Sequence, residues 1–333
     1  MKAVVMATAG GPGVLQYQDL PDPKLKTKTD VLVRLRAAGI NPIDTKLRQR
    51  GPLIADKTPT VLGCDGAGVV EAIGSEVTQF QVGDEVYFFN GGVGGPRGNY
   101  AELAVLDERF LAKKPNSLSF EEAAAAPLVL ITAWESLYDR GQLEPNRRVL
   151  IHAGAGGVGH VAIQLAKLKG AEVCTTVGSR EKADFVRQLG ADYPILYKKR
   201  DFVEAAMEWT NGEGVDLAFD TVGSETFYQT AKAVKVYGDL VTLLEPKAEF
   251  GTLSTARRRN LRIGLELMLT PLVDGIVEEQ HQQTKILQQC ARMIDENRLK
   301  IHLNRTFPLQ DAAEAHKLLG EGSMTGKIVL TMD

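Results

Sequence analysis

The stretch "VLIHAGAGGVGHVAIQLAK" occupies residues 149–167 and decides the fold of the middle of the chain. An apolar run, 149–153, predicts a buried strand, and the apolar periodicity after the glycines predicts a helix. Gly154 permits a tight turn between them, Gly156 lets the backbone approach a pyrophosphate, and Gly159 lets the helix pack closely. Gly157 and Val158 complete the loop at the helix N-terminus, where free N–H groups attract phosphate. Strand, glycine spacing and helix together indicate a dinucleotide site rather than a glycine-rich turn without a ligand.

The segments around this stretch predict two domains. From about residue 123 to 272, strands such as "AEVCTTVG", "GVDLAFDTVG" and "GDLVTLLE" alternate with helical patterns, which is typical of a doubly wound parallel sheet. Residues 1–122 contain short strands with Gly and Pro turns, and predict a small β-barrel. Ser119 and Glu122 form a capping-box pattern that opens a helix at the junction. The tail, 273–333, is expected to return to the barrel domain.

Composition limits the class of protein. The 333 residues include 39 Lys+Arg and 42 Asp+Glu, a net charge of −3, which argues against nucleic acid or a membrane surface as partner. Cys64, Cys174 and Cys290 are too widely spaced for a CxxC zinc cage or a disulfide framework, so a cytoplasmic protein is expected. The sequence contains no run of about 18 apolar residues, so no membrane span is expected. The basic runs at 198–200 and 257–259 are interpreted as solvated faces.

The end of the second predicted strand of the parallel sheet indicates which nicotinamide cofactor binds. An acidic residue there would hold a ribose 2′-OH and mark NAD. This chain instead has Ser179, Arg180 and Lys182 in "TTVGSREK". A hydroxyl and two cations suit a 2′-phosphate, so NADPH is predicted. The alternative is that both cations are surface charges near a helix start.

A second polar stretch, "GINPIDTKL" at residues 39–47, follows the predicted strand "DVLVRLRAA". Asn41, Asp44 and Lys46 lie just after the end of this predicted strand. They are interpreted either as a catalytic site or, structurally, as a turn at Asn41 followed by a helix cap at Asp44.

The chain resembles the zinc-free quinone and enone reductases, the zeta-crystallin type, of the medium-chain dehydrogenase/reductase superfamily. The resemblance rests on "GINPIDTKLRQRG", "LGCDGAGVVEAIG", "VGDEVY", "GNYAEL", "AAAAPLVLITAWESL", "AGAGGVGHVAIQLAKLKGAEV", "FDTVG" and "GKIVL". It implies a GroES-like β-barrel domain, 1–122 and 273–333, with an inserted Rossmann-type domain, 123–272. Zinc-containing relatives have metal ligands where this chain has Asn41, Cys64-Asp65 and the region of Leu128, so no metal is expected.

The resemblance also implies roles for individual residues. Asn41 and Lys46 would donate to a substrate carbonyl or the nicotinamide ribose, and Asp44 would orient Lys46 or the ribose. Further cofactor contacts are implied near the nicotinamide, the adenosine 2′-phosphate and two strand ends: Thr132, Tyr197, Thr221 and Leu244. His152 and His160 are given structural or phosphate-proximal roles rather than proton transfer.

The predicted activity is hydride transfer from NADPH to a quinone or an α,β-unsaturated carbonyl compound, both of which can accept hydride without a Lewis acid. A strict quinone reductase without enone activity stays open. So does a cofactor-binding structural or RNA-binding protein of the crystallin type, although aromatic-basic patches are lacking. The apolar segment 260–268, "NLRIGLELM", is expected to be a long strand at the sheet edge and to pair with its twin in a homodimer.

Overall fold

A computed structural model describes residues 1–54, 60–95 and 97–332. The chain divides into two compact units: Met1–Leu128 with Leu269–Asp333, and Val129–Met268. These divisions fall a few residues inside the predicted limits of the inserted domain, 123 and 272. The difference at the first boundary arises because helix α2 (Phe120–Ala124) packs on β3 (Asp30–Ile40) and β5 (Asp65–Ile73) of the first unit.

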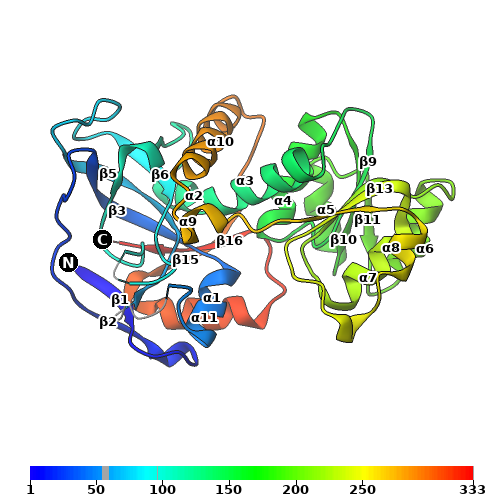
Figure 1. Ribbon diagram of the computed structural model, residues 1–333, viewed down its shortest axis with the longest axis horizontal. Coiled ribbons are helices and arrows are strands. Elements are labelled where there is room, and N and C mark those ends of the chain that lie inside the picture. Colours follow the sequence, from blue (N-terminus) through cyan, green and yellow to red (C-terminus); the bar gives the residue numbers. More distant parts are fainter. Residues whose placement is uncertain (55–59, 96, 333) are drawn as a thin grey trace. The chain divides into compact units, whose positions relative to one another are not determined.

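The first unit is built on two sheets. The smaller has the order β2-β1-β4, and the larger has the order β15-β16-β3-β5-β6-β8, with β7 pairing to β3. The remaining strands of the unit are β1 (Lys2–Met6), β2 (Leu15–Asp19), β4 (Thr60–Val61), β6 (Glu85–Phe89), β7 (Leu103–Asp107), β8 (Ala112–Lys113), β15 (Leu303–Pro308) and β16 (Lys327–Thr331). Strand β16, drawn in red, lies antiparallel beside the blue β3 (Figure 1), so the C-terminal segment completes the N-terminal sheet.

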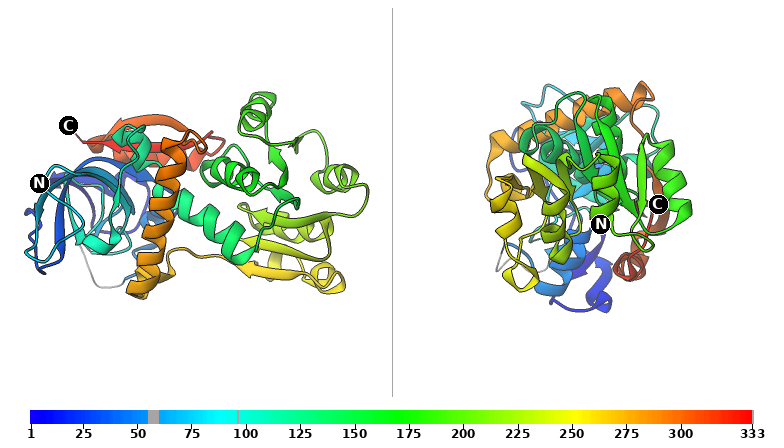
Figure 2. Two further views of the ribbon diagram at one scale, coloured as in Figure 1. Left: turned by 90° about the horizontal axis from the view of Figure 1, so that it is seen from above. Right: turned by 90° about the vertical axis from the view of Figure 1, so that its right-hand side faces the viewer.

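Helices cover this unit. They are η1 (Pro12–Val14), α1 (Pro42–Arg50), η2 (Glu108–Phe110), α2, α9 (Thr270–Val273), α10 (Val277–Asp295), η5 (Leu309–Asp311) and α11 (Ala312–Glu321), and the beginning of α3 (Pro127–Trp134). The predicted capping box is confirmed, because Ser119 Oγ accepts from Glu122 N at 3.2 Å and Glu122 Oε2 accepts from Ser119 N at 3.0 Å. The long helix α10 contacts β6 and β8 and runs beside the strands of its unit (Figure 2).

The second unit contains a six-stranded parallel sheet of order β11-β10-β9-β12-β13-β14. Its strands are β9 (Arg148–Ile151), β10 (Glu172–Val177), β11 (Tyr193–Leu196), β12 (Val215–Asp220), β13 (Val234–Thr242) and β14 (Arg262–Leu265). Its helices are most of α3, the π-helix η3 (Glu135–Arg140), α4 (Gly157–Leu168), α5 (Arg180–Gln188), α6 (Phe202–Trp209), α7 (Ser224–Ala233), η4 (Ala248–Phe250) and α8 (Ser254–Arg258). The doubly wound parallel sheet predicted from the sequence is confirmed.

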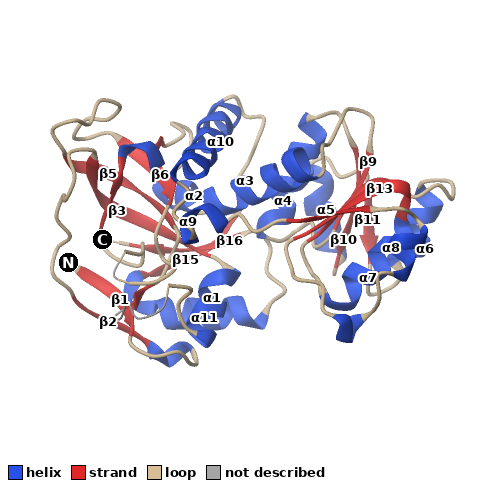
Figure 3. Cartoon of the chain, in the orientation of Figure 1, coloured by secondary structure: helices blue, strands red, loops and turns tan. Residues whose placement is uncertain are grey.

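Both faces of this sheet are buried, as parallel sheets require. One face presents Leu150, Cys174 and Ala218, which pack with residues of α6, α7 and α8. The alternate residues Val149 and Val173 are also fully buried. Figure 3 shows helices flanking the strands of this unit.

Segment 260–268 differs from its prediction. Strand β14 covers residues 262–265 at the sheet edge, so the predicted edge position is correct and the predicted length is too great. Directly after the strand, Glu266 is 5% exposed and accepts from Arg140 Nε at 2.9 Å. Leu265 and Leu267 remain exposed on either side of it.

Candidate functional site

The predicted cofactor residues of the second unit, apart from Thr132, gather at one edge of its sheet. The glycine turn follows β9, Ser179 follows β10, Tyr197 follows β11, Thr221 follows β12, and Leu244 lies just beyond β13. Because all these strands are parallel, their carboxyl ends meet at one edge, where open α/β sheets bind ligands.

The three glycines are needed for different steric reasons. A Cβ on Gly154 would lie 2.1 Å from Thr175 Oγ1, and one on Gly159 would lie 2.3 Å from Ala153 O. A Cβ on Gly156 would meet a single neighbour, Ala153 O, at 3.2 Å. Thus Gly154 and Gly159 permit close packing of turn, strand and helix. Gly156 has more open surroundings and directly precedes α4, with Gly157 and Val158 in that helix's first turn, as a phosphate-binding turn requires.

A basic cluster lies beyond β10 and β11. Burial and the ammonium of Lys198 lower the pKa of Lys182, so these two cations lie close enough to repel each other. A Cβ built on Gly178 would be 3.4 Å from Tyr197 Oη and 3.6 Å from Lys198 Cε, which places both side chains over the end of β10. Repelling cations near a glycine backbone form a site that favours a multiply charged anion.

The run at 198–200 is exposed, as the interpretation of a solvated face predicts. Within it, Lys198 lies beside Lys182, a proximity that the sequence interpretation did not identify. The signal that could have found it is its position directly after Tyr197 at the end of a parallel strand. Ser179 is the N-cap of α5, and its Oγ accepts from Lys182 N at 3.2 Å. Arg180 occupies the first position of the same helix.

The two histidines near the glycine turn are integrated into the fold. His152 bonds Thr176 Oγ1 at 3.2 Å and Thr230 Oγ1 at 2.8 Å, and burial lowers its pKa to about 4. His160 Nδ1 lies 3.0 Å from Gly156 O. Thr221 donates through Oγ1 to His152 O at 2.9 Å, and Thr132 is buried in α3. These contacts give both histidines structural roles beside the turn.

The second candidate site, in the first unit, centres on Asn41 at the start of α1. Its Nδ2 donates to Asp65 Oδ2 at 2.8 Å, and its Oδ1 accepts from Lys327 Nζ. Lys327 Nζ also donates to Ile40 O at 3.0 Å and lies 3.8 Å from Asp65 Oδ2. Asp44 Oδ2 accepts from Asn41 N at 2.7 Å, as a helix-capping residue does.

This cluster extends through Asp44 to a tyrosine and a histidine. Tyr100 Oη donates to Asp44 Oδ2 at 3.1 Å and lies 3.0 Å from His316 Nε2. Asn41, Asp44 and Tyr100 have no exposed surface, and Lys327 and His316 are 3% and 1% exposed. We call Asn41, Asp44, Asp65, Tyr100, His316 and Lys327 the buried polar cluster.

Burial controls ionisation in this cluster. It raises the pKa of Asp44 to about 7, with Asp65 adding to the rise and Lys327 opposing it. It raises the pKa of Asp65 to about 6, against the opposing effect of Lys327. The pKa of Lys327 is lowered, mainly by burial. Two carboxyl groups facing one ammonium therefore retain a proton close to neutral pH.

The resemblance implies that Asn41 and Lys46 donate to a substrate carbonyl or the nicotinamide ribose and that Asp44 orients Lys46 or the ribose. In this structure the side chains of Asn41 and Asp44 have no exposed surface. Asp44 also does not orient Lys46: among the described residues no ion pair joins them, because residues two apart on a helix point in different directions. Lys46 is half-buried, and its pKa is lowered by burial and by Arg50.

Sequence reasoning assigned no role to Lys327, Tyr100 and His316. Lys327 and Tyr100 lie within the quoted motifs "GKIVL" and "GNYAEL". A lysine directly before a run of three apolar residues, 328–330, is a usable signal for a buried cation. His316, on α11, carried no local signal.

The positions that hold zinc in metal-containing relatives do not fit a metal here. Asp65 uses one oxygen for Asn41 and the other to accept from Leu128 N at 2.9 Å. Cys64 is buried, and its thiol pKa is raised well above the usual value by burial and the neighbouring carboxylates. One thiol and one carboxylate do not make a catalytic zinc site. Among the described residues, no group of three or more His, Cys, Asp or Glu is arranged to hold a metal ion.

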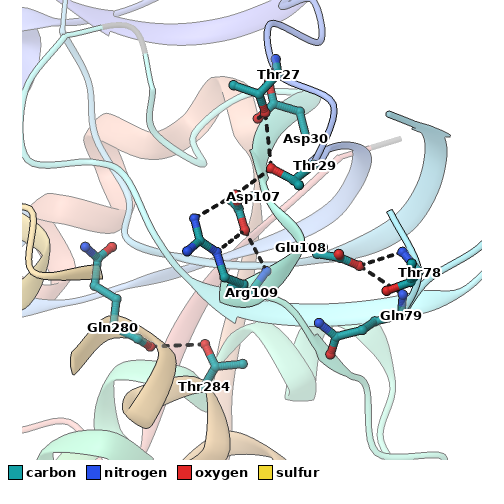
Figure 4. Close-up of polar contacts among 10 residues, drawn as sticks. All are labelled: Thr27, Thr29, Asp30, Thr78, Gln79, Asp107, Glu108, Arg109, Gln280 and Thr284. Atoms are coloured by element: carbon teal, nitrogen blue, oxygen red, sulfur yellow. Dashed lines mark hydrogen bonds and ion pairs between the residues drawn. The ribbon is translucent and has the colours of Figure 1, made fainter. Parts of the chain in front are cut away.

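Cavities lie elsewhere in the first unit. One of about 320 Å³ is lined by the 20–26 segment and β7, and another of about 370 Å³ borders α10. Polar groups at or near the second are engaged with one another (Figure 4). Asp107 accepts from Thr29 Oγ1 at 2.7 Å and from Arg109 Nε at 2.8 Å, and Gln280 O accepts from Thr284 Oγ1 at 3.2 Å. No described helix combines the length and apolar character needed to cross a membrane.

Known proteins resemble both units. Residues 27–116 match the alcohol dehydrogenase GroES-like domain, and residues 189–330 match the zinc-binding dehydrogenase family. The chain is 36% identical to a quinone oxidoreductase of Pseudomonas aeruginosa, covering 99% of each chain. It is 30% identical to a 2-haloacrylate reductase of a Burkholderia species, covering 98% of each.

Among solved structures, an Escherichia coli quinone oxidoreductase complexed with NADPH is 28% identical, with a TM-score of 0.86 and full coverage of both chains. With a GroES-like unit, a parallel-sheet unit and these full-length relatives, the chain belongs to the medium-chain dehydrogenase/reductase superfamily, in its zeta-crystallin-like quinone oxidoreductase branch.

Proposed function

We propose that the protein is an NADPH-dependent oxidoreductase that transfers hydride to quinones or other α,β-unsaturated carbonyl compounds without a metal ion. The observation that carries the proposal is the grouping of the glycine turn and the basic cluster at one edge of the parallel sheet. A turn for a pyrophosphate beside cations for a third phosphate matches the charge distribution of NADPH. The NADPH complex of the Escherichia coli relative supports the same cofactor.

The residues assigned to NADPH have distinct tasks. Gly154, Gly156 and Gly159, with the first turn of α4, would hold the pyrophosphate. Ser179, Arg180 and Lys182, joined by Tyr197 and Lys198, would hold the 2′-phosphate. Thr132, Thr221 and Leu244 would border the nicotinamide half of the cofactor. When bound, the cofactor supplies the hydride.

The acceptor class follows from the relatives and from the chemistry without a metal. The relatives are a quinone oxidoreductase and a 2-haloacrylate reductase. Quinones and activated alkenes both delocalise the charge that hydride addition creates, so hydrogen-bond donors are sufficient to stabilise it. Lys46, half-buried in the middle of α1, is the donor that we assign to the acceptor. Asn41 is assigned a supporting role, in which it joins Asp65 to Lys327.

Lys327 places its Nζ inside the first unit, 3.8 Å from Asp65 Oδ2. Its ammonium contacts Asn41, beside the Asp65 and Leu128 positions that bind zinc in metal-containing relatives. This arrangement supports metal-independent chemistry.

The test is an assay of NADPH oxidation against benzoquinones, alkenals, cyclic enones and 2-haloacrylates, with elemental analysis of the same samples. Turnover that persists after chelation, with far less than one zinc per chain, is expected. Inactivity toward every acceptor, or loss of activity on chelation that zinc restores, would refute the proposal. Activity confined to quinones would favour the strict quinone reductase.

A structural or RNA-binding role is a different class of function, and a gel-shift titration over salt concentration distinguishes it. The near-neutral net charge of −3 predicts no RNA shift at physiological salt.

A further inference from the structure

The proposed reaction needs a proton as well as a hydride. Addition of hydride to a quinone gives a hydroquinone anion, and addition to an enone gives an enolate, so each acceptor takes up one proton afterwards. The cofactor supplies the hydride alone. A group within the protein that holds a proton near neutral pH and can be reloaded would meet this need.

The buried polar cluster contains such a group. Asp44 and Asp65 face one ammonium, that of Lys327, and the cluster is sealed from solvent. With both carboxyl groups ionised it would carry one buried negative charge in excess, which a low-dielectric interior disfavours. One proton on Asp44 removes that excess.

The hydrogen bonds around Tyr100 define a direction for proton movement. Its single hydroxyl hydrogen points to Asp44 Oδ2, at 3.1 Å. The contact of 3.0 Å with His316 Nε2 therefore requires the histidine to donate, which assigns the Nε2–H tautomer. His316 Nδ1 is then an unprotonated acceptor. Burial and the nearby Arg48 lower the pKa of His316 to about 3, so the ring stays neutral.

The series of hydrogen-bonded side chains from Asp44 through Tyr100 to His316 has, at each end, an atom without a hydrogen-bond partner. Asp44 Oδ1 and His316 Nδ1 are buried and accept no hydrogen bond, and Arg48, 3% exposed, has unpartnered Nε and Nη1. Buried polar atoms without partners are rare in folded proteins and mark places where water or another small polar species binds.

We propose that Asp44, Tyr100 and His316 form a proton relay, in which Asp44 delivers the proton consumed by the reaction and the other two reload it. This inference rests on the proposed function. In one cycle the Asp44 O–H bond breaks, and its proton passes through water to the reduced acceptor. Tyr100 then gives its hydroxyl proton to Asp44 and takes the Nε2 proton of His316. A water at Nδ1 gives a proton to that atom and becomes hydroxide, which bulk solvent neutralises. The histidine thereby changes tautomer without carrying a full positive charge, and it must return to the Nε2–H tautomer before the next cycle.

Tyr100 and His316 act through Asp44, so they are positioning residues whose loss should affect proton transfer and leave cofactor binding intact. Groups facing Asp44 are Asp65, Cys64, Lys327 and Tyr100, and those facing His316 are Arg48 and Tyr100.

The test compares Tyr100→Phe with Tyr87→Phe in the full-length protein. Tyr87 is a matched control, because it is also fully buried and its hydroxyl donates to Leu287 O at 2.6 Å, outside the cluster. We expect Tyr100→Phe to lower kcat about 10- to 100-fold, to raise the solvent deuterium isotope effect and to leave the Kd for NADPH unchanged. His316→Gln, which keeps a hydrogen-bond donor but cannot exchange tautomers, should reproduce these effects.

The pH profile separates a relay from a structural role. The hydroxyl of Tyr100 lowers the pKa of Asp44, so its removal should raise that pKa and move the fall in kcat at high pH to higher pH. Tyr87→Phe should leave the fall in place. An unchanged solvent isotope effect and pH profile in Tyr100→Phe and His316→Gln would overturn the relay while wild-type turnover still supports the proposed function. If Tyr100→Phe does not fold, His316→Gln decides by the same readouts.

Discussion

Replacement of Lys327 by Met removes one ammonium from the buried polar cluster and keeps the length of the side chain. Lys327 Nζ bonds Asn41 Oδ1 and Ile40 O, and lies 3.8 Å from Asp65. At pH 8, above the pKa values of about 7 for Asp44 and about 6 for Asp65, both carboxylates would lose the cation that faces them. Breaking a buried charge pair in this way typically costs about 3–5 kcal/mol of unfolding free energy.

The loss should be smaller at pH 5. Both carboxyl groups have pKa values raised above the usual 3.8, so the folded protein binds more protons than the unfolded chain between about pH 4 and pH 7. Their contribution to stability therefore falls as pH rises across that range. At pH 5 both groups are mostly protonated, and the substitution removes chiefly the hydrogen bonds to two neutral oxygens, about 1–3 kcal/mol.

Urea unfolding of wild-type protein and Lys327→Met at pH 5 and pH 8 measures this difference. Lys114→Met is the matched control, because Lys114 is also buried and bonds Pro115 O and Leu118 O, but its carboxylate partner Glu85 is 53% exposed. Its loss should be similar at the two pH values. An equal loss for Lys327→Met at both pH values would refute the assignment of Lys327 as the counter-charge of the cluster.

Three further predictions concern the cofactor, the active site and assembly. Lys182→Ala should weaken the binding of NADPH about ten- to hundredfold, which corresponds to about 1.5–3 kcal/mol for a charge-assisted hydrogen bond, and should have little effect on the binding of NADH. The control Lys169→Ala should change neither Kd. Fluorescence titration measures both Kd values, and equal weakening of both cofactors would contradict a 2′-phosphate site. Asn41→Ala should lower the melting temperature, because it leaves buried hydrogen-bond partners unpaired. Lys46→Met should lower turnover about tenfold, which corresponds to about 1.4 kcal/mol, at an unchanged melting temperature. Turnover of Lys46→Met within threefold of wild type would remove Lys46 from the mechanism. The protein should be a homodimer through β14, and Leu265→Asp, at a side chain 61% exposed, should yield monomers; light scattering that shows a wild-type monomer at micromolar concentration contradicts this.

Local patterns in the sequence were sufficient to predict several structural features. The glycine turn, the order of strands and helices from 148 to 265 and the Ser119–Glu122 capping box all involve residues close together in the chain. Their geometry depends on the conformational freedom of glycine, on periodic burial and on short-range hydrogen bonds. The length of the edge strand was not evident from the sequence, because the apolar pattern continues to Met268 whereas the strand ends at Leu265.

The same distinction applies to the candidate sites. The sequence by itself determined the two-domain architecture, the glycine turn and the presence of Asn41 and Asp44 at a strand end. Only the tertiary structure decided what surrounds them: Lys327 is 286 residues from Asn41, and His316 is 216 residues from Tyr100. It also placed Lys198, within the exposed run at 198–200, beside Lys182. The physical reason is that burial and long-range contacts set the charge state and direction of a polar side chain, whereas neighbouring residues set only its backbone conformation.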